Sequence, residues 1–334
     1  MDIKDFENKT IKVSINDYIG KIICADCLDI LKQLPDKSID CILTDPPYFG
    51  IVKNDWDNQW KDIFDFQKWV GELGKEFARV LKDNGSFYWF GDDKTIAYCQ
   101  VELDKYFRLL NSIVWNKTNG MCQKGACSVF RCFAPITERI LFYDKGEDKT
   151  GLEMVKEVMP NPFADYLAKE FERAKVTRKQ IAELFPSKTG GLTGCVSNWL
   201  NGDNVITQEQ YLKIKEFLGG DYLSKEYEEL RKEYEELRRP WNNDRKAFDV
   251  LDFPVCTDDG RFHPTQKPLA LISYLMERST RQGDVVFDPF SGSGTTAIAC
   301  HNLKRRFICV EKDFDYWKAS CKRLEEHQKQ LTLF

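Results

Sequence analysis

Short apolar runs alternate with stretches of helical periodicity near the start of the chain. Residues 22–25 and 39–43 form two such runs, and between them Leu28, Leu31 and Leu34 recur at the spacing of a helix face. This pattern predicts a short buried strand ending at Asp26, a helix, and a second buried strand. Two apolar strands joined by a helix are typical of a parallel α/β sheet.

The alternation continues to about residue 145, stops, and resumes at residue 262. Further helices are expected over 66–82, 95–105 and 269–278 and at the C-terminal end, and further strands over 86–90, 109–115, 139–143, 285–290 and 305–311. The intervening residues show only helical stretches and the charged segment KEYEELRKEYEELRR, typical of a solvated helix with ion pairs. We therefore predict a doubly wound, mostly parallel sheet in a discontinuous core of residues 1–150 and 251–334, with residues 151–250 as a helical insertion.

Composition narrows the class of protein. The chain has 334 residues, 42% of them hydrophobic, and a formal net charge of −4, which argues against binding nucleic acid through overall charge but leaves room for a local basic face. No apolar run approaches the roughly 20 residues that span a bilayer, and the first residues lack a signal pattern, so a cytoplasmic protein is expected. The twelve cysteines are scattered without paired ligand spacing, so we expect free thiols and no metal site.

A glycine turn follows the apolar strand near residue 287. Gly292 and Gly294 would let the backbone approach a ligand at the start of a helix, and Glu311 ends the next strand 19 residues after Gly292. That distance suits an acid that reaches a ribose hydroxyl. A third glycine is missing, and Asp288 suits the amino-acid part of a zwitterionic methionine better than a pyrophosphate. The turn therefore favours an adenosyl-methionine ligand over a dinucleotide.

The tetrad Asp45-Pro46-Pro47-Tyr48 directly follows the second apolar strand. The prolines stiffen the turn and leave the Asp45 carboxylate and the Pro46 carbonyl as fixed acceptors. Two acceptors on the hydrogens of an aromatic amino group would make its lone pair available, and Tyr48 offers a ring on which a base could stack. The tetrad therefore indicates chemistry on the amino group of a base that has left the duplex.

Together with HPTQKP at 263–268 and FSGSG at 290–294, the tetrad resembles the β group of DNA amino-methyltransferases, in the order of that family. The resemblance implies S-adenosylmethionine as cofactor, duplex DNA as substrate, and Asp45, Pro46, Pro47 and Tyr48 as the catalytic residues. The implied cofactor site comprises Asp26, Thr265, Lys267, Asp288, Phe290, Gly292, Gly294, Thr295 and Glu311. Within it, Asp26 would contact the adenine, and Thr265 and Lys267 the methionine carboxylate. Aspartate at the first position of the tetrad resembles adenine-N6 enzymes more than cytosine-N4 enzymes.

Residues 176–218 of the insertion resemble a helix-turn-helix, although the segment between the helices exceeds the usual three or four residues. Seven basic against four acidic side chains over 173–218 give a local charge of +3. We expect this segment to recognise the target DNA; a helical bundle that only braces the core is the alternative. The candidate DNA-binding residues are Arg178, Lys179, Lys188, Ser197 and Asn198.

Three other functions are considered. A cytosine-N4 methyltransferase would use the same machinery. A DNA-binding regulator without catalysis would not need the intact tetrad and glycine turn, and a nucleotide-dependent oxidoreductase would leave the tetrad unexplained. By analogy with the resembled group a homodimer is expected, whereas the sequence leaves open whether a cognate restriction endonuclease accompanies the enzyme.

Overall fold

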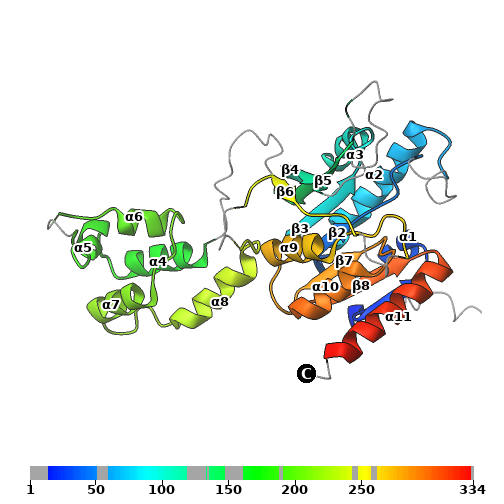
Figure 1. Cartoon of the computed structure of the whole chain (residues 1–334). Helices are drawn as coiled ribbons and strands as arrows, with labels where there is room; N and C mark the ends of the chain where they lie inside the picture. Colours follow the sequence, from blue (N-terminus) through cyan, green and yellow to red (C-terminus); the bar gives the residue numbers. More distant parts are fainter. Residues whose placement is uncertain are drawn as a thin grey trace, which may run out of the picture. The chain divides into compact units, whose positions relative to one another are not determined.

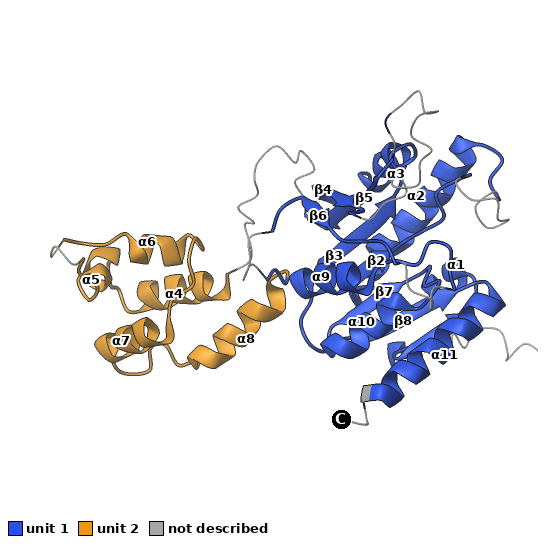
Figure 2. Ribbon diagram, in the orientation of Figure 1, with its two compact units in different colours: residues 1–152, 240–334 blue, residues 153–239 orange. Residues whose placement is uncertain are grey.

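A computed structural model describes residues 14–50, 59–118, 133, 135–146, 161–187, 191–242, 247–256 and 262–331 (Figure 1). The chain divides into two compact units (Figure 2). Unit 1 comprises Met1–Leu152 and Pro240–Phe334, and unit 2 comprises Glu153–Arg239. Unit 2 is narrower than the expected insertion of 151–250, because Trp241 packs on the core of unit 1 and residues 250–252 add a strand to its sheet.

Unit 1 is built on an eight-stranded sheet with the order β1-β8-β7-β2-β3-β5-β4-β6. The strands are β1 (Lys21–Cys24), β2 (Ile39–Thr44), β3 (Leu81–Gly91), β4 (Arg108–Asn116), β5 (Thr137–Asp144), β6 (Val250–Asp252), β7 (Val285–Asp288) and β8 (Arg306–Glu311). Neighbouring strands pair in parallel, except that β5 runs antiparallel to both β3 and β4. The mostly parallel sheet predicted from the sequence is confirmed.

Helices cover both faces of this sheet. They are α1 (Cys27–Leu31), α2 (Ile63–Val80), α3 (Ile96–Leu103), α9 (Leu269–Ser279), α10 (Thr295–Leu303) and α11 (Phe314–Leu331). Successive side chains of a strand point to opposite faces. In β3, Phe87 and Trp89 accordingly pack with α1, α2 and α3, whereas Tyr88 and Phe90 join the cluster that includes α9 and α10. The unit is therefore doubly wound.

The helix α2 illustrates how the sequence sets these elements. Its N-cap Asp62 accepts hydrogen bonds from the backbone amides of Phe64 and Asp65, which would otherwise lack partners in the first turn. Phe66, Val70 and Phe77 recur on one face and are buried against the sheet. The helix ends at Val80, and β3 begins at the next residue.

Two details differ from the sequence-based expectations. The strand predicted over 22–25 is β1, which lies at the edge of the described sheet beside β8; of its residues only Ile22 is buried, and Cys24 is exposed. The three-residue strand β6 was not predicted, because so short a run carries no periodicity.

Unit 2 consists of helices around a core of its own. They are α4 (Pro162–Arg173), α5 (Arg178–Ala182), α6 (Cys195–Leu200), α7 (Gln208–Leu218) and α8 (Tyr227–Leu237). Phe163, Leu167, Trp199 and Tyr211 are buried together at its centre. The charged helix α8 carries the expected ion pairs at a spacing of four residues. Among the described residues of both units, no helix is long and apolar enough to cross a membrane.

Candidate active site

The sheet order places a crevice between β7 and β2. From β7 the chain proceeds through α10 to β8 on one side, and from β2 it proceeds through α2 to β3 on the other side. Ligands of open α/β sheets bind at the carboxyl ends of the strands where the order reverses in this way. A pocket of about 500 Å³ lies there, within the size range of small-molecule sites.

The glycine turn after β7 forms one wall of this pocket. Gly292 and Gly294 have φ values of +47° and +73°, a region that favours glycine. Glu311, at the end of β8, accepts a hydrogen bond from the Gly292 amide through Oε2 at 2.8 Å and one from the Asp313 amide through Oε1 at 2.9 Å. The carboxylate that was expected to face a ribose therefore also fixes the turn.

Asp288 lies beneath the turn and is 4% exposed. Its Oδ1 accepts a hydrogen bond from the Phe290 amide at 3.1 Å, and its Oδ2 accepts one from the Thr296 hydroxyl at 2.5 Å. Burial raises the pKa of Asp288 to about 7, and the nearby carboxylates of Asp45 and Glu311 act in the same direction. The site therefore holds a carboxyl group whose charge is poised near neutral pH.

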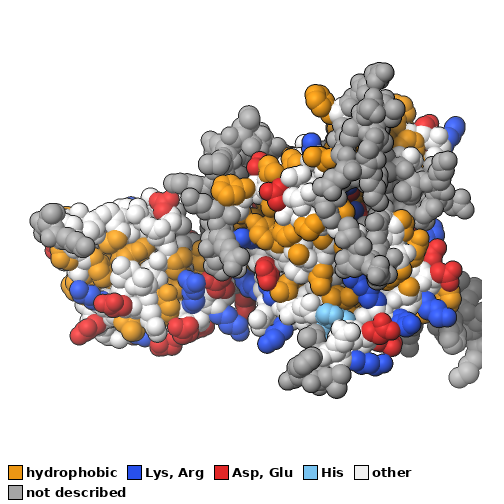
Figure 3. All heavy atoms as spheres, viewed as in Figure 1, with side chains coloured by type: hydrophobic (Ala, Val, Ile, Leu, Met, Phe, Trp, Pro, Cys, Tyr) orange, Lys and Arg blue, Asp and Glu red, His pale blue; other side chains and the backbone are white. Residues whose placement is uncertain are grey.

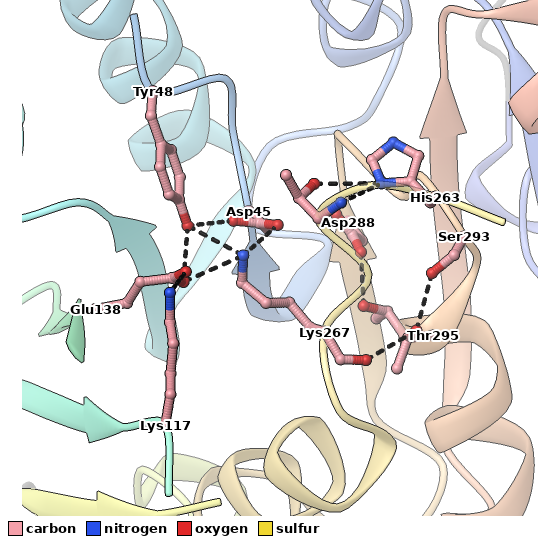
Figure 4. A network of polar contacts seen from close by, with 11 residues as sticks. Asp45, Tyr48, Lys117, Glu138, His263, Lys267, Asp288, Ser293 and Thr295 are labelled. Atoms are coloured by element: carbon pink, nitrogen blue, oxygen red, sulfur yellow. Dashed lines mark hydrogen bonds and ion pairs between the residues drawn. The ribbon is translucent and has the colours of Figure 1, made fainter. Parts of the chain in front are cut away.

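The tetrad after β2 forms the opposite wall, where a charged network surrounds Asp45 (Figure 4). Lys267 Nζ donates to Asp45 Oδ2 at 2.7 Å and to the Tyr48 hydroxyl at 3.1 Å, and it lies 3.2 Å from Glu138 Oε2. The Tyr48 hydroxyl donates to Asp45 Oδ1 at 2.5 Å. Lys117 Nζ lies 2.5 Å from Glu138 Oε1 and completes the network. Two ammonium groups thus face two carboxylates at this end of the sheet.

Burial and pairing act in opposite directions on these groups. Burial raises the pKa of Asp45, while the Lys267 ammonium opposes that rise. Burial would lower the pKa of Lys267, but the carboxylates of Asp45 and Glu138 prevail and raise it. Burial would likewise raise the pKa of Glu138, but Lys267 and Lys117 prevail and lower it. Glu138 and Lys267 are therefore an ionised pair at neutral pH.

The backbone just beyond the tetrad adopts an uncommon conformation. Phe49 has a φ of +68°, which is costly for a bulky residue and persists only where packing enforces it. Its ring lies 5.7 Å from that of Phe66, and further aromatic contacts run through Trp60 and Trp69 to Phe290. These rings join the loop after the tetrad to the glycine turn.

The structure gathers nearly all of the expected catalytic and cofactor-binding residues around one pocket. The four tetrad residues line it, as do Asp26, Thr265, Lys267, Asp288, Phe290, Gly292, Thr295 and Glu311. Gly294 does not: a side chain there would point toward Ser320 and Ile22, so this glycine serves the turn and its packing on α11 and β1. The Lys267 ammonium, expected at a methionine carboxylate, is engaged by Asp45 and Glu138.

The expected DNA-binding residues lie in unit 2. Arg178 and Lys179 are exposed in the first turn of α5, and Ser197 and Asn198 are half-buried on α6. Lys188 lies outside the described residues. On the face shown in Figure 3, acidic and basic side chains are intermixed on each unit.

Glu138 and Lys117 were missed by the sequence-based reasoning. An acid at the start of the apolar strand TERILFY was the available signal, but a single acid at a strand end is common. Glu138 reaches the site because β5 is antiparallel to β3. The first residues of β5 therefore lie at the same end of the sheet as the carboxyl ends of β2 and β3.

The pocket suits a zwitterionic adenosyl ligand. Ser291 Oγ is buried beside it and has no hydrogen-bond partner among the described residues, so a ligand group could satisfy it. A side chain at Gly292 would lie 3.3 Å from the His263 ring, so the turn leaves that space clear. Asp288 and Glu311 supply acceptors for an ammonium group and for hydroxyls. Among the described residues, no group of His, Cys, Asp and Glu is arranged to hold a metal ion.

Comparison with known proteins agrees with this geometry. Residues 39–322 match the DNA methylase family N6_N4_Mtase. The chain is 27% identical over 323 residues to the Type II methyltransferase M2.DpnII of Streptococcus pneumoniae, which covers 91% of this chain and 89% of that protein.

Two solved structures share the fold. The M1.HpyAVI–SAM complex has a TM-score of 0.51 at 22% identity, covering 91% of this chain and 99% of that chain. The PvuII DNA methyltransferase (cytosine-N4-specific) has a TM-score of 0.55 at 14% identity, and the match covers 92% of this chain and 90% of that chain. With the family match over most of its length, the chain belongs to the DNA methylase family and is a DNA methyltransferase whose methyl donor is S-adenosylmethionine.

Proposed function

We propose that this enzyme methylates N6 of an adenine that is flipped out of duplex DNA, with the tetrad Asp45-Pro46-Pro47-Tyr48 as its catalytic element. The observation that carries the proposal is the meeting of this tetrad with the glycine turn in one pocket. Aspartate at the first tetrad position favours adenine over cytosine N4, by resemblance to the adenine-specific enzymes.

The residues of the tetrad would prepare the amino group for attack. The Asp45 carboxylate and the Pro46 carbonyl would each accept one of its hydrogens, which favours a tetrahedral nitrogen with a free lone pair. Tyr48 would position the base against its ring. These roles are positioning and electrostatic stabilisation of the positive charge that grows on the nitrogen.

The opposite wall would hold the cofactor, which supplies an electrophilic methyl group when bound. Glu311 would accept hydrogen bonds from the ribose hydroxyls, and Asp288 would face the methionine ammonium group. Asp26, at the N-cap of α1, would reach the adenine. Thr265 would bind the methionine carboxylate, whereas the Lys267 ammonium, which the resemblance places there as well, is held by Asp45 and Glu138.

The product decides the base assignment. We expect wild-type enzyme, incubated with S-adenosylmethionine and unmethylated duplex DNA, to yield N6-methyladenine after digestion to nucleosides and mass spectrometry. N4-methylcytosine would preserve the mechanism but overturn the choice of base. DNA of diverse sequence that stays unmethylated, despite measurable cofactor binding, would contradict the proposal as a whole.

The raised pKa of Asp288 makes cofactor affinity depend on pH. The methionine ammonium pairs with the ionised carboxylate, so the Kd should level off just above pH 7 and should rise by up to about tenfold per pH unit below it. Calorimetry between pH 5.5 and 7.5, below the usual pKa of an α-amino group, would measure this, with release of about one proton near pH 6. Asp288→Asn should bind more weakly and lose the pH dependence. A wild-type Kd that does not change with pH would show that Asp288 does not carry this charge.

Unit 2 would recognise the target DNA through α5 and α6. Arg178 and Lys179 would contact phosphates, while Ser197 and Asn198 would reach base edges. Replacing both Arg178 and Lys179 with alanine should raise the Kd for DNA about tenfold at 0.1 M salt. It should also reduce the slope of log K against log salt concentration by about one to two. Lys232→Ala on α8 is the matched control in the same unit. Equal affinity and salt slope in the double variant would favour a bundle that only braces the core.

By the same resemblance we propose that the enzyme forms a homodimer, that a restriction endonuclease accompanies it, and that it acts in the cytoplasm, where its DNA substrate would lie. Sedimentation of the purified enzyme tests the first of these two partners. Cleavage of unmethylated but not of modified DNA by an extract of the source cells tests the second.

A further inference from the structure

The Lys267 ammonium occupies the carboxylate that the proposed reaction needs. Its three N–H groups face three acceptors: Asp45 Oδ2 at 2.7 Å, the Tyr48 hydroxyl at 3.1 Å and Glu138 Oε2 at 3.2 Å (Figure 4). The lysine side chain is 7% exposed. In this arrangement an internal amine sits where the amino group of a target base would donate its hydrogen.

Both oxygens of Asp45 are engaged in this way, because Oδ1 accepts the Tyr48 hydroxyl. A carboxylate has about four lone-pair sites, but the Lys267 ammonium competes for the negative charge of Asp45, so an amino group that takes the place of Lys267 must displace it. Removing an ammonium group from its carboxylate inside a protein is costly if the cation is left unpaired. The site thus needs a second acceptor for Lys267 within reach.

Glu138 is built to be that acceptor. It is the second residue of β5, opposite Trp115 of β4, and the backbone pairing continues with Lys117 donating from its amide to the Ile136 carbonyl. The Lys117 ammonium holds Glu138 Oε1 at 2.5 Å, which leaves Oε2 directed at Lys267 and the Tyr48 hydroxyl. The Glu138 side chain is 14% exposed, and its two carboxylate oxygens contact these partners.

We propose that Glu138 is a positioning residue that receives the Lys267 ammonium when the target amino group takes its place on Asp45. This inference rests on the proposed function, since it assigns the event that frees the tetrad for the base. The two carboxylates and the two ammonium groups keep the network neutral while Lys267 shifts between neighbouring acceptors. Without the Glu138 charge, two cations would share one carboxylate, and Lys267 would remain bound to Asp45.

The test is a set of variants measured by single-turnover methyl transfer, with radiolabelled S-adenosylmethionine and unmethylated plasmid DNA, both saturating. Glu138→Gln preserves size and removes the charge, and we expect it to slow methyl transfer about 30-fold. Its cofactor Kd from calorimetry should stay within about threefold of wild type. Glu76→Gln removes another partly buried carboxylate that is paired with a cation, on α2, and should leave the rate within about twofold.

The double variant Glu138→Gln with Lys267→Met separates positioning from a structural role. If Glu138 acts by drawing Lys267 away from Asp45, removing the ammonium should raise the rate at least fivefold above that of Glu138→Gln alone. A double variant as slow as or slower than Glu138→Gln would overturn the proposal, and so would a Glu138→Gln enzyme as fast as wild type. Failure of the proposed function is distinct from both, since the wild-type enzyme itself would then leave DNA unmethylated.

Discussion

Replacing Asp45 with asparagine is expected to slow methyl transfer by about 10³-fold while the affinity for S-adenosylmethionine stays within about threefold of wild type. The carboxylate accepts a hydrogen from the target amino group and stabilises the positive charge that develops on the nitrogen. An amide of the same size lacks the charge and can present an N–H₂ group where an acceptor is needed. Single-turnover transfer to unmethylated DNA measures the first quantity, and calorimetry the second.

The expected split between rate and affinity follows from the geometry. Asp45 belongs to the tetrad wall, whereas Asp288 and Glu311 form the wall that would bind the cofactor. Lys267 keeps Glu138 as a partner in the variant, so the buried ammonium is not stranded. Asp29→Asn, on the exposed surface of α1, serves as the matched control. A variant that keeps a tenth or more of the wild-type rate would remove Asp45 from the chemistry.

The elements of unit 1 could be predicted because each carries its signal locally. The β2 and β7 runs are mostly apolar, with Asp40 as the exception inside β2 and Asp288 as the last residue of β7, as expected for strands buried on both faces. The edge strand β1 shows where the same reasoning fails. Its sequence is equally apolar, but exposure at the edge is decided by the order of the sheet, to which a local run contributes nothing.

The two motifs could likewise be identified, but their meeting could not be derived from local pattern. Asp45 and Asp288 are far apart in sequence and become neighbours because β2 pairs with β7. The resemblance to a family supplied that expectation. The resemblance did not predict the contact between Glu138 and Lys267, because that contact depends on the antiparallel register of β5 against β3 and β4. The preference of Lys267 for Asp45 is a balance of burial and charge that no motif spacing encodes.

Glu311→Gln is expected to weaken the binding of S-adenosylmethionine about 100-fold. In the wild-type protein each carboxylate oxygen accepts one backbone amide, from Gly292 and from Asp313. A carboxylate has about four lone-pair sites, so two remain for the ribose hydroxyls. Hydrogen bonds to a charged group contribute about 1.5–3 kcal/mol each, and 1.4 kcal/mol corresponds to a tenfold change in Kd.

The glutamine has one acceptor oxygen and one N–H₂ group, so it cannot serve both amides and both hydroxyls. If its oxygen keeps the Gly292 amide, its N–H₂ group faces the Asp313 amide, donor against donor, and the hydroxyls lose an acceptor. If the side-chain amide is rotated by 180°, the Gly292 amide loses its hydrogen-bond acceptor and the glycine turn is no longer held in place. Either orientation raises the Kd, which calorimetry measures, while Glu326→Gln on the exposed surface of α11 should leave it unchanged. An unchanged Kd in Glu311→Gln would place the ribose elsewhere in the pocket and would leave Glu311 as a brace for the turn alone.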